Sequence, residues 1–258
     1  MKRILGIAMV LGLVGALSVN AQPVKAGKTD VIDLGKGVKL EMVLIPAGKF
    51  VMGSPAFEYG RDKLETQHKV TLTKPFYMGK YEVTQEQYEA VMGKNPSTIK
   101  GAKLPVTNMS WEDCQDFIKK LNAKTYGGFR LPTEAEWEYA CRAGASTAYS
   151  FGKKITPKDA NYDDSGIDKI IEAGSYKPNT FGLYDMHGNV WEWCEDLYGE
   201  YSAGAVTDPK GPAEGNHRVL RGGSFDHSGS IARSSFRNYG CKPTFRLDNY
   251  GFRLAKDK

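Results

Sequence analysis

Apolar positions recur at helical spacing in three parts of the chain, and each part opens with a capping signal. Tetrapeptides with a hydroxyl residue first and an acid or amide last begin at Thr84, Ser110 and Thr133. In this arrangement the hydroxyl accepts from an early helix amide, and the fourth side chain reaches back to the capping amide. Apolar residues then follow at helical intervals, as at 114, 117, 118 and 121. We expect three helices, the first running to about Met92 and the third ending before Gly144.

Short runs rich in β-formers, separated by turn residues, predict strands around these helices. They are Met42–Ile45, Phe50–Met52, His68–Leu72, Phe76–Tyr81, Arg218–Leu220 and Gly251–Leu254. The stretch 146–180 has no sustained period and is predicted to be an ordered loop, for which bound ions would supply a reason. No repeat or linker divides the chain, so we expect a single loop-rich domain.

The first residues have the pattern of a secretory signal peptide. Met1-Lys2-Arg3 is basic, residues 4–17 are mostly apolar, and Val19-Asn20-Ala21 is a small-x-small cleavage signal. The apolar run is shorter than the roughly 20 residues of a membrane span. We therefore predict a signal peptide over residues 1–21, an N-terminal extension over 22–38, and a protein exported to the periplasm or the exterior without a membrane span.

Composition narrows the possible partners and cofactors. The formal charge of +5 is spread along the chain without a dense basic run, so nucleic acid is not an expected partner. Four cysteines remain after cleavage, which permits two disulfides in three possible pairings in an exported protein. No C-x-x-C spacing occurs, which disfavours a structural zinc site. Glu134, Glu136 and Glu138 alternate along a predicted helix and are interpreted as cap and surface groups rather than a catalytic pair.

Six blocks in a fixed order resemble the formylglycine-generating enzyme, or sulfatase-modifying factor, family. They are VLIPAGKFVMGS (43–54), GKYEVTQEQ (79–87), RLPTEAEWEYACRAG (130–144), DMHGNVWEWCED (185–196), RVLRGGSF (218–225) and NYGFRLA (249–255). The resemblance covers residues 39–256 and implies an α+β, C-type-lectin-like fold with little regular secondary structure. It also makes Cys141–Cys241 the preferred disulfide.

Calcium is the cofactor that the resemblance implies. Carried over to this chain, one ion would be held by the side chains of Asp185 and Glu192 and the carbonyls of Gly188 and Val190. A second would be held by Asn161, Tyr162 and Asp164, with Asp168 as an alternative because the loop lengths differ. Calcium takes six to eight oxygen ligands of these kinds.

Copper is not expected. Catalytic members of the family have two cysteines after the RGGS segment, which bind copper(I) and engage the substrate thiol. Here the corresponding positions are His227 and Ala232. A histidine and an alanine cannot form the bis-thiolate site that copper(I) prefers.

The segment Phe225–Tyr250 combines aromatic, small polar and arginine side chains, a composition typical of adaptable recognition loops. The cleft candidates are Ser224, His227, Arg233 and Asn249; the resemblance matches Asn249 to an active-site asparagine. Our first hypothesis is a calcium-stabilised factor that binds a protein or peptide. The alternatives are an oxidative modifying enzyme with a non-cysteine site, and a variable ligand-binding protein of a diversity-generating retroelement.

Overall fold

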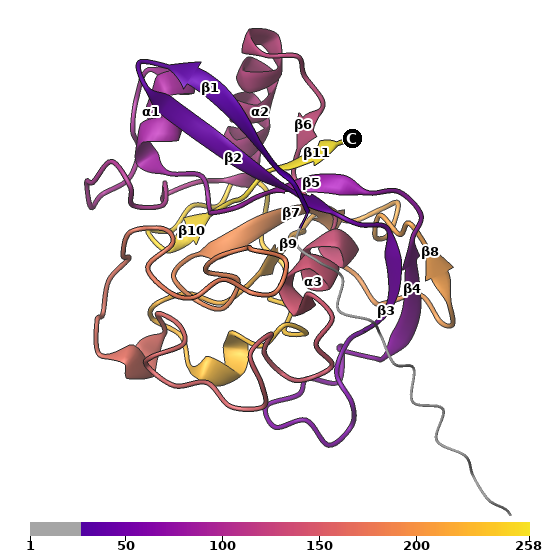
Figure 1. The fold of residues 1–258 in the computed structure, drawn as a ribbon. Helices are drawn as coiled ribbons and strands as arrows, with labels where there is room; N and C mark the ends of the chain where they lie inside the picture. The colour runs from indigo at the N-terminus through magenta and orange to yellow at the C-terminus, as the bar shows by residue number, and fades with distance from the viewer. Residues whose placement is uncertain (1–26) are drawn as a thin grey trace, which may run out of the picture.

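The computed structural model describes residues 27–258, and the predicted signal peptide lies outside the described residues. The fold is mixed α+β, with three sheets, three α-helices and long connections (Figure 1). The five-stranded sheet has the order β1 (Thr29–Gly35), β2 (Val38–Ile45), β5 (Phe76–Gly79), β11 (Ala255–Asp257), β6 (Phe129–Arg130). The three-stranded sheets are β10 (Tyr250–Gly251), β7 (Trp191–Leu197), β9 (Arg218–Arg221), and β3 (Gly48–Met52), β4 (His68–Leu72), β8 (Val206–Thr207).

All three predicted helices are present, and each begins at the predicted cap. They are α1 (Gln85–Met92), α2 (Trp111–Lys124) and α3 (Glu134–Arg142), and each has a complete capping box. Helix α1 ends at Gly93 in a left-handed conformation, as expected. None of the helices among residues 27–258 is long and apolar enough to cross a membrane.

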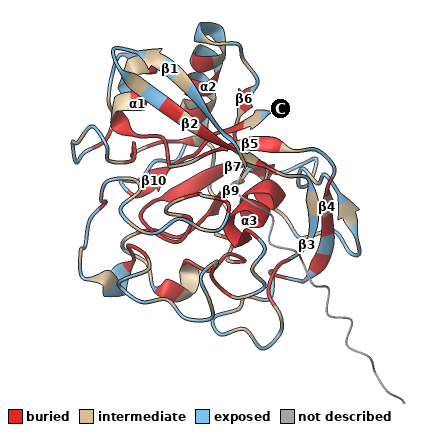
Figure 2. Ribbon diagram, in the orientation of Figure 1, coloured by how far each residue is buried: buried red, intermediate tan, exposed pale blue. Residues whose placement is uncertain are grey.

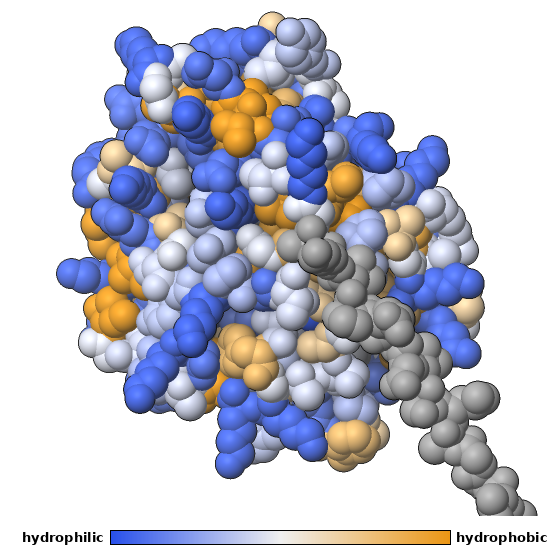
Figure 3. Space-filling view, viewed as in Figure 1, coloured by the Kyte–Doolittle hydropathy of each residue, from blue (hydrophilic) through white to orange (hydrophobic). Residues whose placement is uncertain are grey.

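Two apolar clusters hold these elements together. In the first, Tyr88 of α1 stacks on Phe117 of α2, and Phe117 meets Phe252 edge to face. In the second, Trp137 and Tyr139 of α3 pack under β2, β3 and β5. Figure 2 shows that β7, β9 and α3 are almost wholly buried at the centre of the molecule. On the face in Figure 3, apolar residues form small separate patches in a hydrophilic surface.

The strands match the prediction only in part. Strand β1 lies within the segment predicted as an N-terminal extension and pairs with β2 from Thr29↔Val43 onward. The predicted strand Gly251–Leu254 is replaced by the flanking strands β10 and β11. Strand β7 was missed because its acidic residues do not alternate with apolar ones as in a half-exposed strand.

The stretch 146–180 is an irregular loop, as predicted, apart from a 3₁₀ turn at Asp163–Ser165. Side-chain amides hold it in place. The Oδ1 atom of Asn189 accepts from Asn161 Nδ2 at 3.1 Å and from the amide of Ile171 at 3.0 Å. Asn179 donates to the last carbonyls of α3. Asn161 is itself a predicted calcium ligand, and Asn189 lies between Gly188 and Val190. The contacts that order the loop therefore lie beside the predicted calcium sites.

The preferred Cys141–Cys241 disulfide is not formed; all four cysteines are free thiols. Cys141 is buried in the second apolar cluster, 3.7 Å from His187 Nε2. Cys241 packs on the edge of the first cluster, 3.2 Å from Tyr250 Oη. The two thiols therefore lie in different parts of the core, and the pairing that the resemblance implied does not occur.

Candidate functional site

The cleft segment starts where strand β9 ends. Gly222 and Gly223 follow Arg221 with positive φ values of 96° and 75°, which side chains other than glycine rarely adopt. A Cβ at Gly223 would lie 3.1 Å from the Cα of Ala232, so the chain passes directly against itself at this turn. The two glycines therefore place Ser224 at the start of a short loop, residues 224–232, whose last residue packs against Gly223.

Ser224, Asp226, His227 and Asn249 form one hydrogen-bonded group. The Ser224 hydroxyl donates to Asp226 Oδ1 at 2.7 Å and lies 2.7 Å from His227 Nδ1. Asn249 Nδ2 donates to both oxygens of Asp226, at 3.0 and 3.1 Å. Partial burial acts to raise the pKa of Asp226, yet that pKa is lowered because three neighbours donate hydrogen bonds to the carboxylate.

This group is not a nucleophile–base–acid relay. His227 Nδ1 faces both Ser224 Oγ and Asp226 Oδ1, the latter at 2.9 Å. In a relay, the imidazole lies between the two groups and contacts each through a different nitrogen. Here one nitrogen serves both contacts, so the cluster is better suited to holding a ligand than to activating Ser224.

Two buried polar atoms at this site have no hydrogen-bond partner. They are the indole N–H of Trp191, a donor, and Oδ1 of Asn249, an acceptor. Trp191 is 1% exposed and Asn249 7%. The backbone links them, because the Trp191 amide donates to the Asn249 carbonyl at 2.8 Å, and the Trp191 ring packs edge to face on His227. Buried polar groups are almost always paired, so these two atoms are exceptions at this site.

Arg233, the fourth cleft candidate, does not face the cleft. It is 1% exposed, and its guanidinium binds both oxygens of Glu65 at 2.7 Å and Glu58 at 2.7 Å. A guanidinium presents five donors in a rigid fork, and these carboxylates consume most of that capacity. Arg233 is therefore a positioning group that joins the cleft segment to the loop between β3 and β4.

The interpretation of the three α3 glutamates as cap and surface groups is correct only for the cap. Glu136 completes the capping box of Thr133, whereas Glu134 and Glu138 are buried, at 3% and 0% exposed. Glu134 pairs with Arg237 at 2.6 Å, and Glu138 pairs with Arg221 and Arg142. A carboxylate can be buried at this depth only with a compensating cation. Arg142 is four residues from Glu138 on the same helix, whereas Arg221 and Arg237 are distant in sequence, so the helical pattern could show only the first of these pairings.

The first predicted calcium set surrounds a buried excess of negative charge. Glu192 accepts from Arg253 and from the indole of Trp137, whereas Asp185 Oδ1 has no partner. Glu82, fully buried beside them, accepts only from the Asn189 amide. Burial and mutual repulsion raise the pKa of Glu82 well above its usual value, and burial raises that of Asp185 to about 6. One guanidinium thus faces three buried carboxylates, which leaves an excess of negative charge at this position.

The backbone of the first predicted calcium set is also in close contact with another segment of the chain. Gly188 has a φ of 102°, and a Cβ there would lie 2.2 Å from the carbonyl oxygen of Asn161. Val190 is fully buried. Among residues 27–258, however, no three His, Cys, Asp or Glu side chains converge closely enough to hold a metal by themselves. The carbonyls of Gly188 and Val190 would have to supply the remaining oxygens.

The second predicted calcium set fits less well. Asn161 Oδ1 accepts from Ser165 Oγ at 3.1 Å, and the Tyr162 carbonyl accepts from the Ser165 amide. Asp164 and Asp168 are both exposed. The oxygens of Asn161 and Tyr162 are thus already used by the 3₁₀ turn, and an exposed carboxylate has no comparable need for a cation.

The sulfatase-modifying factor enzyme 1-like domain matches residues 33–258. The chain belongs to this family. A variable protein of Treponema denticola superposes on this family member with a TM-score of 0.80 at 31% identity, covering 89% of this chain and 99% of its own. PvdO of Pseudomonas aeruginosa gives a TM-score of 0.80 at 31% identity, covering 90% and 100%. These matches confirm the predicted formylglycine-generating-enzyme-like fold.

Among curated sequences, this sulfatase-modifying factor domain is 36% identical to the serine/threonine-protein kinase pkn1 of Chlamydia pneumoniae. The alignment covers 84% of the domain but only 38% of the kinase. The chain therefore spans well under half of that relative.

The two positions that the resemblance matches to the cysteines of catalytic relatives are His227 and Ala232, neither of which has a sulfur atom. His227 lies in the hydrogen-bonded group above, and the Ala232 carbonyl accepts from His187 Nδ1 at 2.8 Å. The nearby Cys141 thiol is fully buried, and burial raises its pKa to about 12. Because the reactive form is the thiolate, Cys141 is unreactive and cannot replace a missing cysteine.

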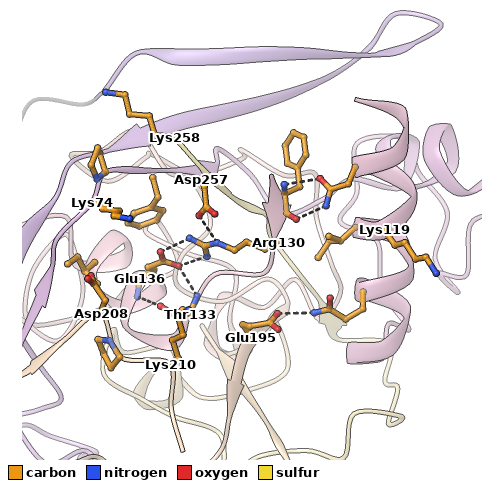
Figure 4. Close-up of a pocket in the computed structure, with 18 residues that line it drawn as sticks. Lys74, Lys119, Arg130, Thr133, Glu136, Glu195, Asp208, Lys210, Asp257 and Lys258 are labelled. Carbon is orange, nitrogen blue, oxygen red and sulfur yellow. Dashed lines mark hydrogen bonds and ion pairs between the residues drawn. The ribbon is translucent and has the colours of Figure 1, made fainter. Parts of the chain in front are cut away.

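A separate groove of about 1030 Å³ lies between α2, β6 and the turn at Asp208, distinct from the cleft (Figure 4). Arg130 at its centre pairs with Glu136 and Asp257, and Asn122 satisfies both backbone groups of the edge residue Phe129. These polar groups are paired within the domain, so none of them needs a ligand to complete its hydrogen bonds.

Sequence reasoning missed two members of the cleft. Asp226 lies between the predicted residues Ser224 and His227. Its short polar side chain was the feature of the sequence that could have indicated it. Trp191 was missed because the burial of its ring with an unpaired N–H depends on tertiary packing.

Proposed function

We propose that this sulfatase-modifying factor domain is an exported factor that binds a peptide or protein segment in the cleft of Ser224, Asp226, His227 and Asn249. In this proposal it does not oxidise cysteine through copper. The occupation of the two cysteine positions by His227 and Ala232 supports this view, because neither residue can form a mixed disulfide with a substrate thiol.

The observation that carries the proposal is the pair of unpartnered atoms, Trp191 Nε1 and Asn249 Oδ1. One is a donor and the other an acceptor, and an unpaired buried polar group costs about 1–3 kcal/mol. A peptide backbone presents both complementary groups, a carbonyl and an amide. Binding such a segment would satisfy both atoms, and the half-exposed Asp226 and His227 side chains would line its path.

Calcium, in this proposal, stabilises the frame behind the cleft. Asp185, Glu192 and the carbonyls of Gly188 and Val190 would hold it, and Glu82 would lie beside it. The ion would neutralise the buried negative charge described above. Val190 and Glu192 lie on either side of Trp191 in the sequence, so the ion would fix the backbone at one edge of the cleft.

A selection from a displayed library of random peptides tests the proposal. Wild-type protein should enrich peptides whose binding weakens by about tenfold or more in Asn249→Leu and in Trp191→Phe. Lys119→Gln, in the groove of Figure 4, serves as the control and should leave binding unchanged. Equal binding by all variants would contradict the cleft as the recognition site.

A second candidate is an oxidative modifying enzyme with a non-cysteine site. The observation in its favour is the network of Ser224, Asp226 and His227, which could hold a polar substrate in a fixed orientation. Oxygen consumption with a cysteine-containing peptide, together with stoichiometric copper or iron in purified protein, would favour this enzyme. Calcium alone, without turnover, would favour the binding factor.

A further inference from the structure

The Asp226 carboxylate keeps unused hydrogen-bonding capacity in the cleft. Its Oδ1 atom accepts from Ser224 Oγ at 2.7 Å, and it also faces His227 Nδ1 at 2.9 Å and Asn249 Nδ2 at 3.0 Å. Within residues 27–258, its Oδ2 atom accepts only from Asn249, at 3.1 Å. A carboxylate has about four lone-pair sites on its two oxygens. Oδ2 can therefore accept from a further donor, and the side chain is 46% exposed, so a ligand can reach it.

No lysine or arginine among the described residues balances the charge of Asp226. Its one ion-pair contact there is with His227, which is charged only when protonated. The loop 224–232 contains no lysine or arginine, and Lys242, on the segment that leads to Asn249, does not pair with Asp226. Because the pKa of Asp226 is lowered, as described above, the carboxylate is ionised at neutral pH. The cleft therefore contains an anion without a permanent counter-ion.

The loop that contacts His227 adds to this negative charge. The Asp163 amide donates to the His227 carbonyl at 3.0 Å, so the 3₁₀ turn Asp163–Ser165 lies beside the cleft segment (Figure 1). Asp163 and Asp164 are exposed, and neither forms an ion pair with a residue in the range 27–258. Residues 160–169 and 224–232 together contain four aspartates and one lysine, a formal charge of −3 with histidine neutral. A cationic ligand is therefore favoured at this edge of the cleft.

A buried acceptor without a partner adjoins Asp226. Asn249 is 7% exposed, and Nδ2 of its amide donates to both oxygens of Asp226. These bonds fix the orientation of the amide, because Oδ1 in the same place would be repelled by the carboxylate. Oδ1 has no partner. Both open positions, Asn249 Oδ1 and Asp226 Oδ2, are thus acceptors, and a ligand that fills them must donate hydrogen bonds.

We propose that the cleft recognises a primary ammonium group of its peptide ligand, which donates to Asn249 Oδ1 and Asp226 Oδ2. This inference rests on the proposed function and specifies the charge of the ligand. An ammonium carries three donors on one atom and needs only one open position on each acceptor. A guanidinium binds best to a carboxylate whose two oxygens are both open, and Oδ1 of Asp226 already faces three groups.

The ammonium can come from the amino terminus of the peptide or from a lysine side chain. At the amino terminus, the carbonyl of the first residue lies close to the ammonium. That carbonyl can accept from the unpaired indole N–H of Trp191. A lysine ammonium lies at the end of a long apolar stem, away from any carbonyl of its own residue. The amino terminus is therefore the expected source, because it satisfies Trp191 together with Asn249.

The test uses the peptides that the library selection enriches, synthesised in matched forms. The amino terminus is free or acetylated, and each lysine of the peptide is kept or replaced by glutamine. Removal of the bound ammonium should weaken binding to the wild-type protein by about tenfold or more, because hydrogen bonds to charged groups are strong. Weakening by acetylation identifies the amino terminus as the source, and weakening by lysine replacement identifies the side chain.

Asp226→Asn tests the protein side of the contact. The change keeps the size of the side chain and removes its charge. Binding of the ammonium form should weaken by about fivefold, because a half-exposed ion pair contributes modestly. The form without the ammonium should bind both proteins equally. Asp30→Asn, which removes an exposed carboxylate from strand β1, is the control and should change neither affinity. Unchanged melting temperatures confirm that both variants fold.

The outcomes separate this inference from the proposed function. If Asn249→Leu weakens binding but neither acetylation nor lysine replacement does, the ammonium proposal is wrong and the cleft proposal stands. The same holds if the peptides require an arginine instead. If the ammonium is required but Asp226→Asn binds it as tightly as the wild type, the ammonium lies elsewhere and the proposal is overturned. If no peptide is enriched, or if Asn249→Leu and Asp226→Asn both leave binding unchanged, both proposals are wrong.

Discussion

The cleft and the arginine framework behind it differ in how they pair their charged and polar groups, although Arg221 Nε of the framework also lacks a hydrogen-bond partner. In the framework, Arg221, Arg237 and Arg253 each bind a carboxylate from a distant part of the chain. In the cleft, Trp191 Nε1 and Asn249 Oδ1 remain without partners. The first arrangement stabilises the free protein, whereas the second leaves two buried polar atoms unsatisfied. Function is therefore expected where burial and hydrogen bonding disagree.

Glu138→Ala should have the largest effect on the framework. The Glu138 carboxylate binds Arg221, Arg142 and the amide of Gly53, so its removal leaves two buried guanidinium groups short of a partner. Breaking such a pair costs about 3–5 kcal/mol. Urea unfolding at neutral pH measures this loss. Glu89→Ala, on the exposed side of α1, should change the free energy of unfolding by less than about 0.5 kcal/mol. Similar values for the two variants would show that the framework is not what stabilises the fold.

Calcium would give the unpaired Asp185 carboxylate oxygen a partner, and the free energy of unfolding shows whether the ion binds there. If an ion binds at Asp185, a concentration of 100 times its Kd should raise the free energy of unfolding by about 2.7 kcal/mol. Thermal unfolding in calcium and in EGTA measures the change, and Asp185→Ala should abolish it. Asp164→Asn should preserve it if the second set binds no ion. A melting temperature that is insensitive to calcium in the wild type would leave Asp185 among the unpaired groups.

Asp196 gives the framework a pH dependence of known sign. Burial raises the pKa of Asp196 to about 8, and repulsion from Glu134 adds to the effect. Between about pH 4 and pH 8 the folded protein keeps a proton that the unfolded chain releases, so this residue makes stability fall as pH rises. The contribution is about 1.4 kcal/mol between pH 6 and pH 7. Asp196→Asn keeps an oxygen that can accept from the Glu134 amide and should flatten the profile by that amount. An identical slope in both proteins would contradict the burial of a protonated carboxyl.

The comparison also explains what could be predicted from the sequence. The capping boxes at Thr84, Ser110 and Thr133 are local, so the helices they start were predicted correctly. Glu134 pairs with Arg237 and Glu138 with Arg221, 103 and 83 residues away in the chain, and only the Glu138–Arg142 pair is local, so no local pattern could show that these acids are buried. Ser224, His227 and Asn249 were located through the family resemblance. Which atoms of the cleft remain unpaired follows only from the packed structure.

Among the substitutions in the cleft and the framework, Asn249→Leu should change the free energy of unfolding least. It therefore separates ligand binding from stability most clearly. The change removes a buried acceptor without a partner, which stabilises the fold, and two hydrogen bonds to Asp226, which destabilises it. Asp226 is half exposed, so water can replace the lost donors. The two effects are similar in size, and the free energy of unfolding should change by less than about 1 kcal/mol. Peptide binding should nevertheless fall by about tenfold or more. Urea unfolding and peptide titration on the same sample separate the two quantities. A loss of stability as large as that of Glu138→Ala would place Asn249 in the framework, and the unpaired atoms of the cleft would then no longer mark a binding site.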